Sequence, residues 1–204
     1  MRKMVEYNAP KRDYEFLLNE VLDAIPIVQK LGYSEFDEEF LSMLTDGWAE
    51  HVKEVWLPVN QLGDREGLTY SDGEIMMPDE FKNAYKESVD AGWLSTSCKP
   101  EHGGMGVPIF FQTVIWAEFG TSANMALSVL PALSVGVYEV LAEHGEKELV
   151  DYFATNMASG KWSGTMCLTE PHAGTDLGMI STKAVPQNDG TYLVTGTKIF
   201  SPCD

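Results

Sequence analysis

The chain has 204 residues and a formal net charge of −17, from 31 acidic and 14 basic side chains. Such a surface would repel nucleic acids and anionic membranes, so we expect neither as a partner. A hydrophobic content of 44% is enough for a packed core and excludes disorder as the main state. The cysteines Cys98, Cys167 and Cys203 match no disulfide or metal-ligand framework. With no signal peptide evident, we expect a cytoplasmic protein without a metal site.

Residues 12–157 have mainly helical periodicity. Apolar side chains recur every four residues on one face and predict an amphipathic helix: Phe36, Phe40, Leu44, Trp48 and Val52. We expect further helices at about 78–92, 110–119 and 147–157, the first of which is opened by a proline and stopped by a glycine. The first part of the chain is therefore predicted to be a helical domain.

A run without charged residues, 121–138, comes close to the roughly 18 residues that span a bilayer. It contains serines, an asparagine, a proline and a glycine, and it lacks flanking Lys/Arg clusters and aromatic belts. We therefore expect a buried helix of the core and no membrane insertion. Turn-rich loops are expected at 60–73 and 99–108.

The pattern changes near residue 160. Strand-like segments occur at 165–168, 180–185 and 192–200, and the last is rich in Thr, Tyr, Val and Ile. The turn residues at 188–190, Asn-Asp-Gly, predict a hairpin between the second and third segments. The sequence thus predicts an α+β protein, with a helical domain followed by the first strands of an antiparallel β domain.

The most informative motif is the turn at 166–176. An apolar, strand-like entry breaks at Thr169-Glu170-Pro171 and reaches a corner at Gly174-Thr175-Asp176. Hydroxyls and backbone N–H groups concentrate there, and the glycine permits close backbone approach, which suits a ligand with ring carbonyls or phosphates. A surface loop without a ligand is the alternative interpretation.

Other polar residues have structural interpretations. His102 and His172 lie in glycine-rich loops without a second metal ligand at suitable spacing, and we interpret both as loop residues. The glycine-rich segment 103–106 follows no strand and precedes no Lys-Ser/Thr, so we expect a turn rather than a phosphate loop. Glu170 and Asp176 are expected to stabilise the turn.

Three strings of residues resemble those of the acyl-CoA dehydrogenases, and they occur in the same order. Residues 164–178, GTMCLTEPHAGTDLG, are similar to the flavin-binding signature of that family. A second family segment is similar to Gly-Trp at 92–93 followed by PEHGGMGVP at 100–108. A family strand of the form Gly-x-Lys-x-Trp/Phe is similar to GTKIF at 196–200. Residues 7–21 are similar to the N-terminal extension of the larger bacterial members. The resemblance covers nearly the whole chain.

The resemblance implies three segments: an N-terminal extension at 1–35, a helical domain at 36–160 and a partial β domain at 161–204. It also implies a function, in which FAD takes hydrogens from the α and β carbons of an acyl-CoA thioester. Implied partners are the acyl-CoA substrate, further copies in a homo-oligomer and an electron-transfer flavoprotein as acceptor.

The implied cofactor-binding residues lie in two of the strings. Met166, Leu168 and Thr169 would contact the flavin ring, and Phe200 would stack beside it. Gly174 and Thr175 would lie by the pyrophosphate and the acyl-CoA entrance, so Thr175 would also contact the substrate.

The last four residues, 201–204, depart from the family pattern. Family members continue with an aliphatic residue, Ser/Thr and Gly, and later supply a catalytic glutamate and a C-terminal helical domain, whereas this sequence reads SPCD. We therefore expect a truncated chain that is inactive alone, with no catalytic residue to name. The alternatives are a non-catalytic fragment that packs against or binds a partner, and an acyl-CoA oxidase or flavin monooxygenase on the same fold.

Overall fold

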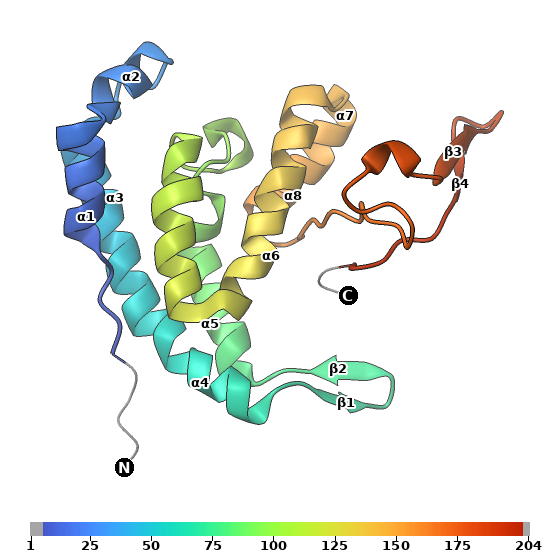
Figure 1. Cartoon of the computed structure of the whole chain (residues 1–204), viewed down its shortest axis with the longest axis horizontal. Helices are drawn as coiled ribbons and strands as arrows, with labels where there is room; N and C mark the ends of the chain where they lie inside the picture. Colours follow the sequence, from blue (N-terminus) through green and yellow to red (C-terminus); the bar gives the residue numbers. More distant parts are fainter. Residues whose placement is uncertain (1–5, 202–204) are drawn as a thin grey trace.

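The protein consists of a helical body followed by a smaller strand-bearing segment, in a computed structural model that describes residues 6–201 (Figure 1). The longer helices are α2 Ala24–Lys30, α3 Glu38–His51, α4 Leu57–Glu66, α5 Asp79–Asp90 and α6 Ala117–His144. Shorter pieces are α1 Lys11–Glu15, α7 Lys147–Leu149 and α8 Thr155–Ala158, with wide π-type turns η1 Phe16–Val21, η2 Val52–Trp56, η5 Phe111–Trp116 and η6 Val150–Ala154. Tight 3-10 turns are η3 Trp93–Ser95, η4 Pro100–His102 and η7 Leu177–Met179.

Two antiparallel hairpins complete the fold. One pairs β1 Thr69–Ser71 with β2 Glu74–Met76, and the other pairs β3 Lys183–Pro186 with β4 Tyr192–Thr195. The second turns at 188–190 as the sequence predicts, with Lys183 opposite Thr195 and Pro186 opposite Tyr192. The predicted helical domain followed by antiparallel strands is confirmed for β3–β4, whereas β1–β2 lies between α4 and α5 within the helical part.

The amphipathic helix expected around Trp48 is confirmed as α3. The side chain of Asp37 accepts a hydrogen bond from Phe40 N at 2.7 Å and caps the first turn. The helix continues through η2 into α4, so the loop expected at 60–73 is wrong for its first half. Leu57 and Val59 of α4 pack against the core, and this burial favours helix up to Gly67, where φ is 61°.

The hairpin β1–β2 was not predicted, although the sequence carries its signal. Asp72 and Gly73 both have positive φ, 53° and 90°, as a tight hairpin turn requires. After this hairpin, α5 starts directly beyond Pro78 and gives way to the left-handed Gly92, in agreement with the expected helix at 78–92.

The core of the helical body is built around tryptophans. Trp48 stacks on Trp116 with ring centroids 5.1 Å apart, and Trp56 meets Trp48 edge-on at 5.0 Å. Each indole N–H is satisfied, from Trp48 to Trp116 O, from Trp116 to Trp93 O and from Trp56 to Ser88 Oγ. This cluster ties α3, η2 and η5 together.

The charge-free run forms most of α6, which is broken at Asn124. The backbone there has non-helical angles, φ −158° and ψ 96°, and the side chain caps the new start by accepting from Leu127 N at 3.2 Å. By length and composition, Phe111–His144 could span a membrane, with 28% of its most apolar window buried. The expectation of a buried core helix is therefore met only in part.

The strand expected at 165–168 is wrong, because these residues are irregular. Gly164 instead donates through its N–H to Ser134 Oγ of α6 at 3.0 Å, and Leu168 O accepts from Lys198 Nζ at 2.8 Å. The third expected strand, 192–200, is shorter than predicted: β4 ends at Thr195, and the chain then turns back toward the 164–178 string.

Candidate cofactor site

Two segments that are far apart in sequence meet at the predicted cofactor site. Ile199 N donates to Thr169 O at 3.0 Å, and Lys198 Nζ donates to Leu168 O at 2.8 Å. The residues that the resemblance assigns to the flavin ring, at 166–169 and at 200, are therefore brought to one part of the molecule.

The turn is held by the buried carboxylate of Glu170. Its Oε1 accepts from Thr182 N at 3.0 Å, from Thr182 Oγ1 at 2.5 Å and from Lys198 Nζ at 3.0 Å. Its Oε2 accepts from Ser181 N at 2.9 Å and from Ser181 Oγ at 2.8 Å. These bonds, led by that from the Thr182 hydroxyl, hold the pKa of Glu170 well below its usual value. Glu170 is thus an ionised structural hub, as the expected turn-stabilising role requires.

The other polar residues of the turn have local partners. Asp176 Oδ1 accepts from Gly178 N at 3.1 Å and caps the turn η7. His172 Nε2 lies 3.1 Å from Met179 O and 3.5 Å from Glu170 Oε2, which supports the interpretation of a loop residue. Among residues 6–201, no cluster of three potential metal ligands is present.

The predicted flavin contacts are exposed apolar groups. Met166 is 54% exposed, Leu168 39% and Phe200 83%, and Phe200 has a φ of 55° that turns the chain at this point. Exposed apolar side chains around a polar turn fit the edge of a planar cofactor, which would cover them. Gly174 adjoins Thr169, since a Cβ at Gly174 would lie 3.7 Å from Thr169 Cγ2, and Thr175 is exposed beside it. The roles of these six residues remain predictions.

Sequence reasoning missed the residues that hold this arrangement together. Ser181, Thr182 and Lys198 all converge on Glu170. A Cβ at Gly196 would lie 2.0 Å from Thr182 Oγ1, so only glycine permits the close approach of the two segments. The Gly-x-Lys pattern of 196–198 was the available signal, although it was interpreted only as a strand.

Two histidines of the helical body are structural. His102 Nδ1 lies 2.7 Å from Tyr138 OH, which also accepts from Lys99 N at 2.8 Å, so the glycine-rich loop is anchored to α6. His51 Nε2 lies 2.8 Å from Ser88 Oγ, a distance typical of a base and a nucleophile. Ser88 is fully buried and donates its proton to Ala84 O, so this pair has no access to a substrate.

Known proteins place the chain in a family. Residues 43–161 match the model of the acyl-CoA dehydrogenase N-terminal domain. The chain therefore belongs to the acyl-CoA dehydrogenase family, a family of flavoprotein oxidoreductases.

Individual relatives agree with this assignment. The 3-methylmercaptopropionyl-CoA dehydrogenase of Ruegeria pomeroyi is 38% identical over 195 residues, which are 95% of this chain and 33% of that protein. A butyryl-CoA dehydrogenase of Syntrophomonas wolfei is 32% identical over 198 residues, 93% of this chain and 32% of that protein. The chain spans about a third of the length of these relatives.

Solved structures share the fold. The glutaryl-CoA dehydrogenase in complex with glutaryl-CoA superposes with a TM-score of 0.67 at 22% identity, covering 80% of this chain and 39% of that one. An acyl-CoA dehydrogenase of Bacillus anthracis complexed with FAD has a TM-score of 0.63 at 22% identity, covering 81% and 26%.

Proposed function

We propose that this chain supplies one wall of an FAD site in an enzyme that dehydrogenates an acyl-CoA thioester between its α and β carbons. The observation that carries the proposal is the junction of 168–170 with 198–200, which joins the turn that resembles the family's signature to the Gly-x-Lys segment. When bound, FAD would supply the oxidant for the substrate.

The residues of this chain have separate tasks in the proposed site. Met166, Leu168 and Phe200 would bury their exposed surfaces against the cofactor ring and exclude water from it. The Thr169 hydroxyl and the backbone of the turn would orient the ring, since the hydrogen bonds of Glu170 hold the turn in place. Gly174 and Thr175 would face the pyrophosphate and the acyl-CoA.

The proton acceptor of such a reaction has to come from outside the turn. Within 164–200 the acidic residues are Glu170, Asp176 and Asp189, and each already accepts hydrogen bonds. Glu170 in addition has a lowered pKa, which makes its carboxylate a poor base. None of these three acids is therefore proposed as the base, and we propose in addition that the 204-residue chain is inactive alone.

The partners are part of the same proposal. We expect an acyl-CoA substrate, a homo-oligomeric assembly and an electron-transfer flavoprotein as acceptor, in the cytoplasm. One solved structure of this fold, at a TM-score of 0.67 and 23% identity, is described as an electron transferring flavoprotein of Acidaminococcus fermentans. The glutaryl-CoA complex of a related dehydrogenase supports the substrate class.

The experiment is a titration of the chain with FAD, followed by fluorescence polarisation. We expect weak, saturable binding that does not survive gel filtration. Phe200→Ala should weaken binding about three- to tenfold, since it removes a stacking ring. Tyr70→Ala is the matched control, because Tyr70 is an equally exposed aromatic in β1, outside the site.

Two outcomes would overturn the proposal. Either no saturable FAD binding is detected, or Phe200→Ala and Tyr70→Ala bind FAD like the unmodified chain. In the same preparation we expect no acyl-CoA-dependent dye reduction. Turnover by this chain would show that a base lies within it and would contradict the proposal that the chain is inactive alone.

A further inference from the structure

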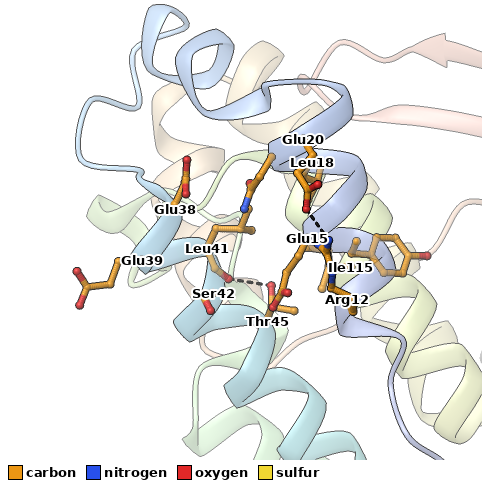
Figure 2. Close-up of a pocket in the computed structure, with 12 residues that line it drawn as sticks. Arg12, Glu15, Leu18, Glu20, Glu38, Glu39, Leu41, Ser42, Thr45 and Ile115 are labelled. Carbon is orange, nitrogen blue, oxygen red and sulfur yellow. Dashed lines mark hydrogen bonds and ion pairs between the residues drawn. The ribbon is translucent and has the colours of Figure 1, made fainter.

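The ammonium group of Lys198 is largely shielded from solvent in its ion pair. Lys198 Nζ lies 3.0 Å from Glu170 Oε1, and the two side chains are 23% and 0% exposed. By contrast, the ion pair of Arg12 with Glu20, beside the hollow between α1 and α3, has side chains that are 66% and 53% exposed (Figure 2). Because water and salt screen surface charges, the charge of Lys198 acts more strongly on its neighbours than that of Arg12.

Lys198 has a second partner, the carbonyl group of Leu168. Its Nζ donates to Leu168 O at 2.8 Å, a distance typical of a charge-assisted hydrogen bond. That oxygen and the N–H of Thr169 belong to the same planar, conjugated peptide unit. A cation on the oxygen draws electrons away from the nitrogen. The Thr169 N–H therefore becomes a stronger hydrogen-bond donor, by about 10–30% if the effect is like that of other cooperative hydrogen bonds.

The direction of the Thr169 N–H is fixed by the peptide units on both sides of this residue. The Thr169 carbonyl accepts from Ile199 N at 3.0 Å. The N–H of Glu170 lies in the same peptide unit as that carbonyl and donates to Ala173 O at 3.0 Å. The preceding peptide unit is held by Lys198. The Thr169 donor is therefore aimed as well as strengthened.

This donor has no acceptor in the described part of the chain. Among residues 6–201, no backbone or side-chain atom accepts a hydrogen bond from the Thr169 N–H. Thr169 is half-buried, and the apolar side chains of Met166 and Leu168 beside it in the sequence are exposed. An unpaired donor next to exposed apolar surface suits a flat ligand that has a hydrogen-bond acceptor at its edge.

We propose that Lys198 is a positioning residue of the FAD site, which strengthens and aims the Thr169 N–H toward an acceptor on the flavin ring. This inference rests on the proposed function, because the flavin ring is the ligand that receives the hydrogen bond. The reduced ring is richer in electrons than the oxidised ring, so a stronger donor favours the reduced form. Lys198 acts through Thr169, without a contact of its own to the ring.

The first test needs no cofactor. In 1H–15N spectra of the free chain, Lys198→Met should move the Thr169 amide nitrogen upfield, because the carbonyl of the same peptide unit loses its charged donor. Lys198→Arg keeps a charged N–H donor and should return the signal toward its original position. Lys183→Met is the matched control: it removes an exposed lysine of β3, outside the turn, and should leave the signal in place.

The second test compares the affinity of the chain for oxidised FAD with that for FAD reduced with dithionite, both without oxygen. Lys198→Met should weaken the binding of reduced FAD roughly two- to tenfold more than the binding of oxidised FAD. Lys198→Arg and Lys183→Met should keep the ratio of the two affinities within about twofold of that of the unmodified chain. A merely structural loss would weaken both forms equally and leave this ratio unchanged.

The inference is overturned if Lys198→Met leaves the Thr169 nitrogen signal in place, or if the two forms of FAD lose affinity equally. If Lys198→Met does not fold, the unmodified chain still decides, because an ordinary chemical shift of the Leu168 carbonyl carbon would show that no charged donor polarises it. A complete lack of FAD binding overturns the proposed function instead, while the spectra of the free chain still test the effect of Lys198 on Thr169. The two failures are therefore distinguishable.

Discussion

The glycine-rich loop before η5 offers a sharp test of the packing. A Cβ at Gly104 would lie 2.1 Å from Cys98 O and 2.4 Å from Cys98 C, about 1.3 Å short of the 3.4 Å at which ordinary contact begins. The Cys98 carbonyl cannot retreat freely, because it accepts from Gly106 N at 2.9 Å. Gly104→Ala must therefore displace backbone that is held on both sides.

The magnitude follows from two costs. Overpacking of this kind costs about 1–3 kcal/mol, and loss of the Gly106 hydrogen bond adds roughly 0.5–1.5 kcal/mol. We expect Gly104→Ala to lower the free energy of unfolding by about 2–4 kcal/mol. For a chain of this size, that corresponds to a melting temperature roughly 4–16 °C lower.

The assay is urea unfolding followed by tryptophan fluorescence, since Trp48, Trp56 and Trp116 are buried and report on the core. Gly136→Ala is the matched control, because a Cβ at Gly136 in α6 meets nothing within 4 Å. That change should stabilise the chain by about 0.5–1 kcal/mol through helix propensity. The reasoning is refuted if Gly104→Ala unfolds at the same urea concentration as the unmodified chain.

Three further predictions concern other parts of the molecule. Burial lowers the pKa of His51 to about 4, below its ordinary value of 6.5, so the unfolded chain binds this proton more readily than the folded chain does. The free energy of unfolding should therefore fall by at most about 3 kcal/mol as the pH drops from 6.5 to 4. A His51→Gln variant should lose this pH dependence in thermal melts. Asn124→Ala removes the hydrogen bonds to Leu127 N and to Trp56 O, and it should lower the free energy of unfolding in urea by about 1–2 kcal/mol. The control Ser122→Ala, at an exposed position, should lower it by less than about 0.5 kcal/mol. Glu170→Gln should speed hydrogen–deuterium exchange at the amides of Ser181 and Thr182, which donate to the Glu170 carboxylate. The amide of Thr191 donates to Asp189 and should keep its protection. Unchanged exchange at Ser181 and Thr182 would contradict the role of Glu170 in holding this segment.

Local patterns predicted the parts of the fold that depend on local burial and caps. The four-residue repeat through Trp48 identified α3, and the proline and glycine at 78 and 92 bounded α5. The sequence was misleading where tertiary contacts determine the conformation. Residues 165–168 have strand composition, yet they do not pair in a sheet: the preceding Gly164 binds Ser134, and Leu168 binds Lys198. The Asp-Gly turn of β1–β2 was readable and was overlooked.

The residues of the candidate site could be predicted from the sequence, but the hydrogen bonds that hold them in place could not. The signature string at 164–178 carries its information in consecutive residues, so it could be recognised from the sequence. The Glu170 hub depends on Ser181, Thr182 and Lys198, which lie 11 to 28 residues away, and no spacing rule brings them to one carboxylate.

The position of the cofactor turn relative to the helical body is set by Gly164. A Cβ at this residue would lie 2.8 Å from both Val137 Cβ and Met157 Cε, and its N–H is already bound to Ser134 Oγ. The turn at 166–176 is therefore held near α6 at its start. Glu170 binds Ser181 and Lys198 and so fixes the turn to the segment 181–198. Because both anchors are made by residues of this chain, they hold the exposed side chains of Met166, Leu168 and Phe200 in a defined arrangement. If the proposed FAD site is correct, the cofactor would gain affinity from this arrangement, because the turn would not have to be ordered on binding.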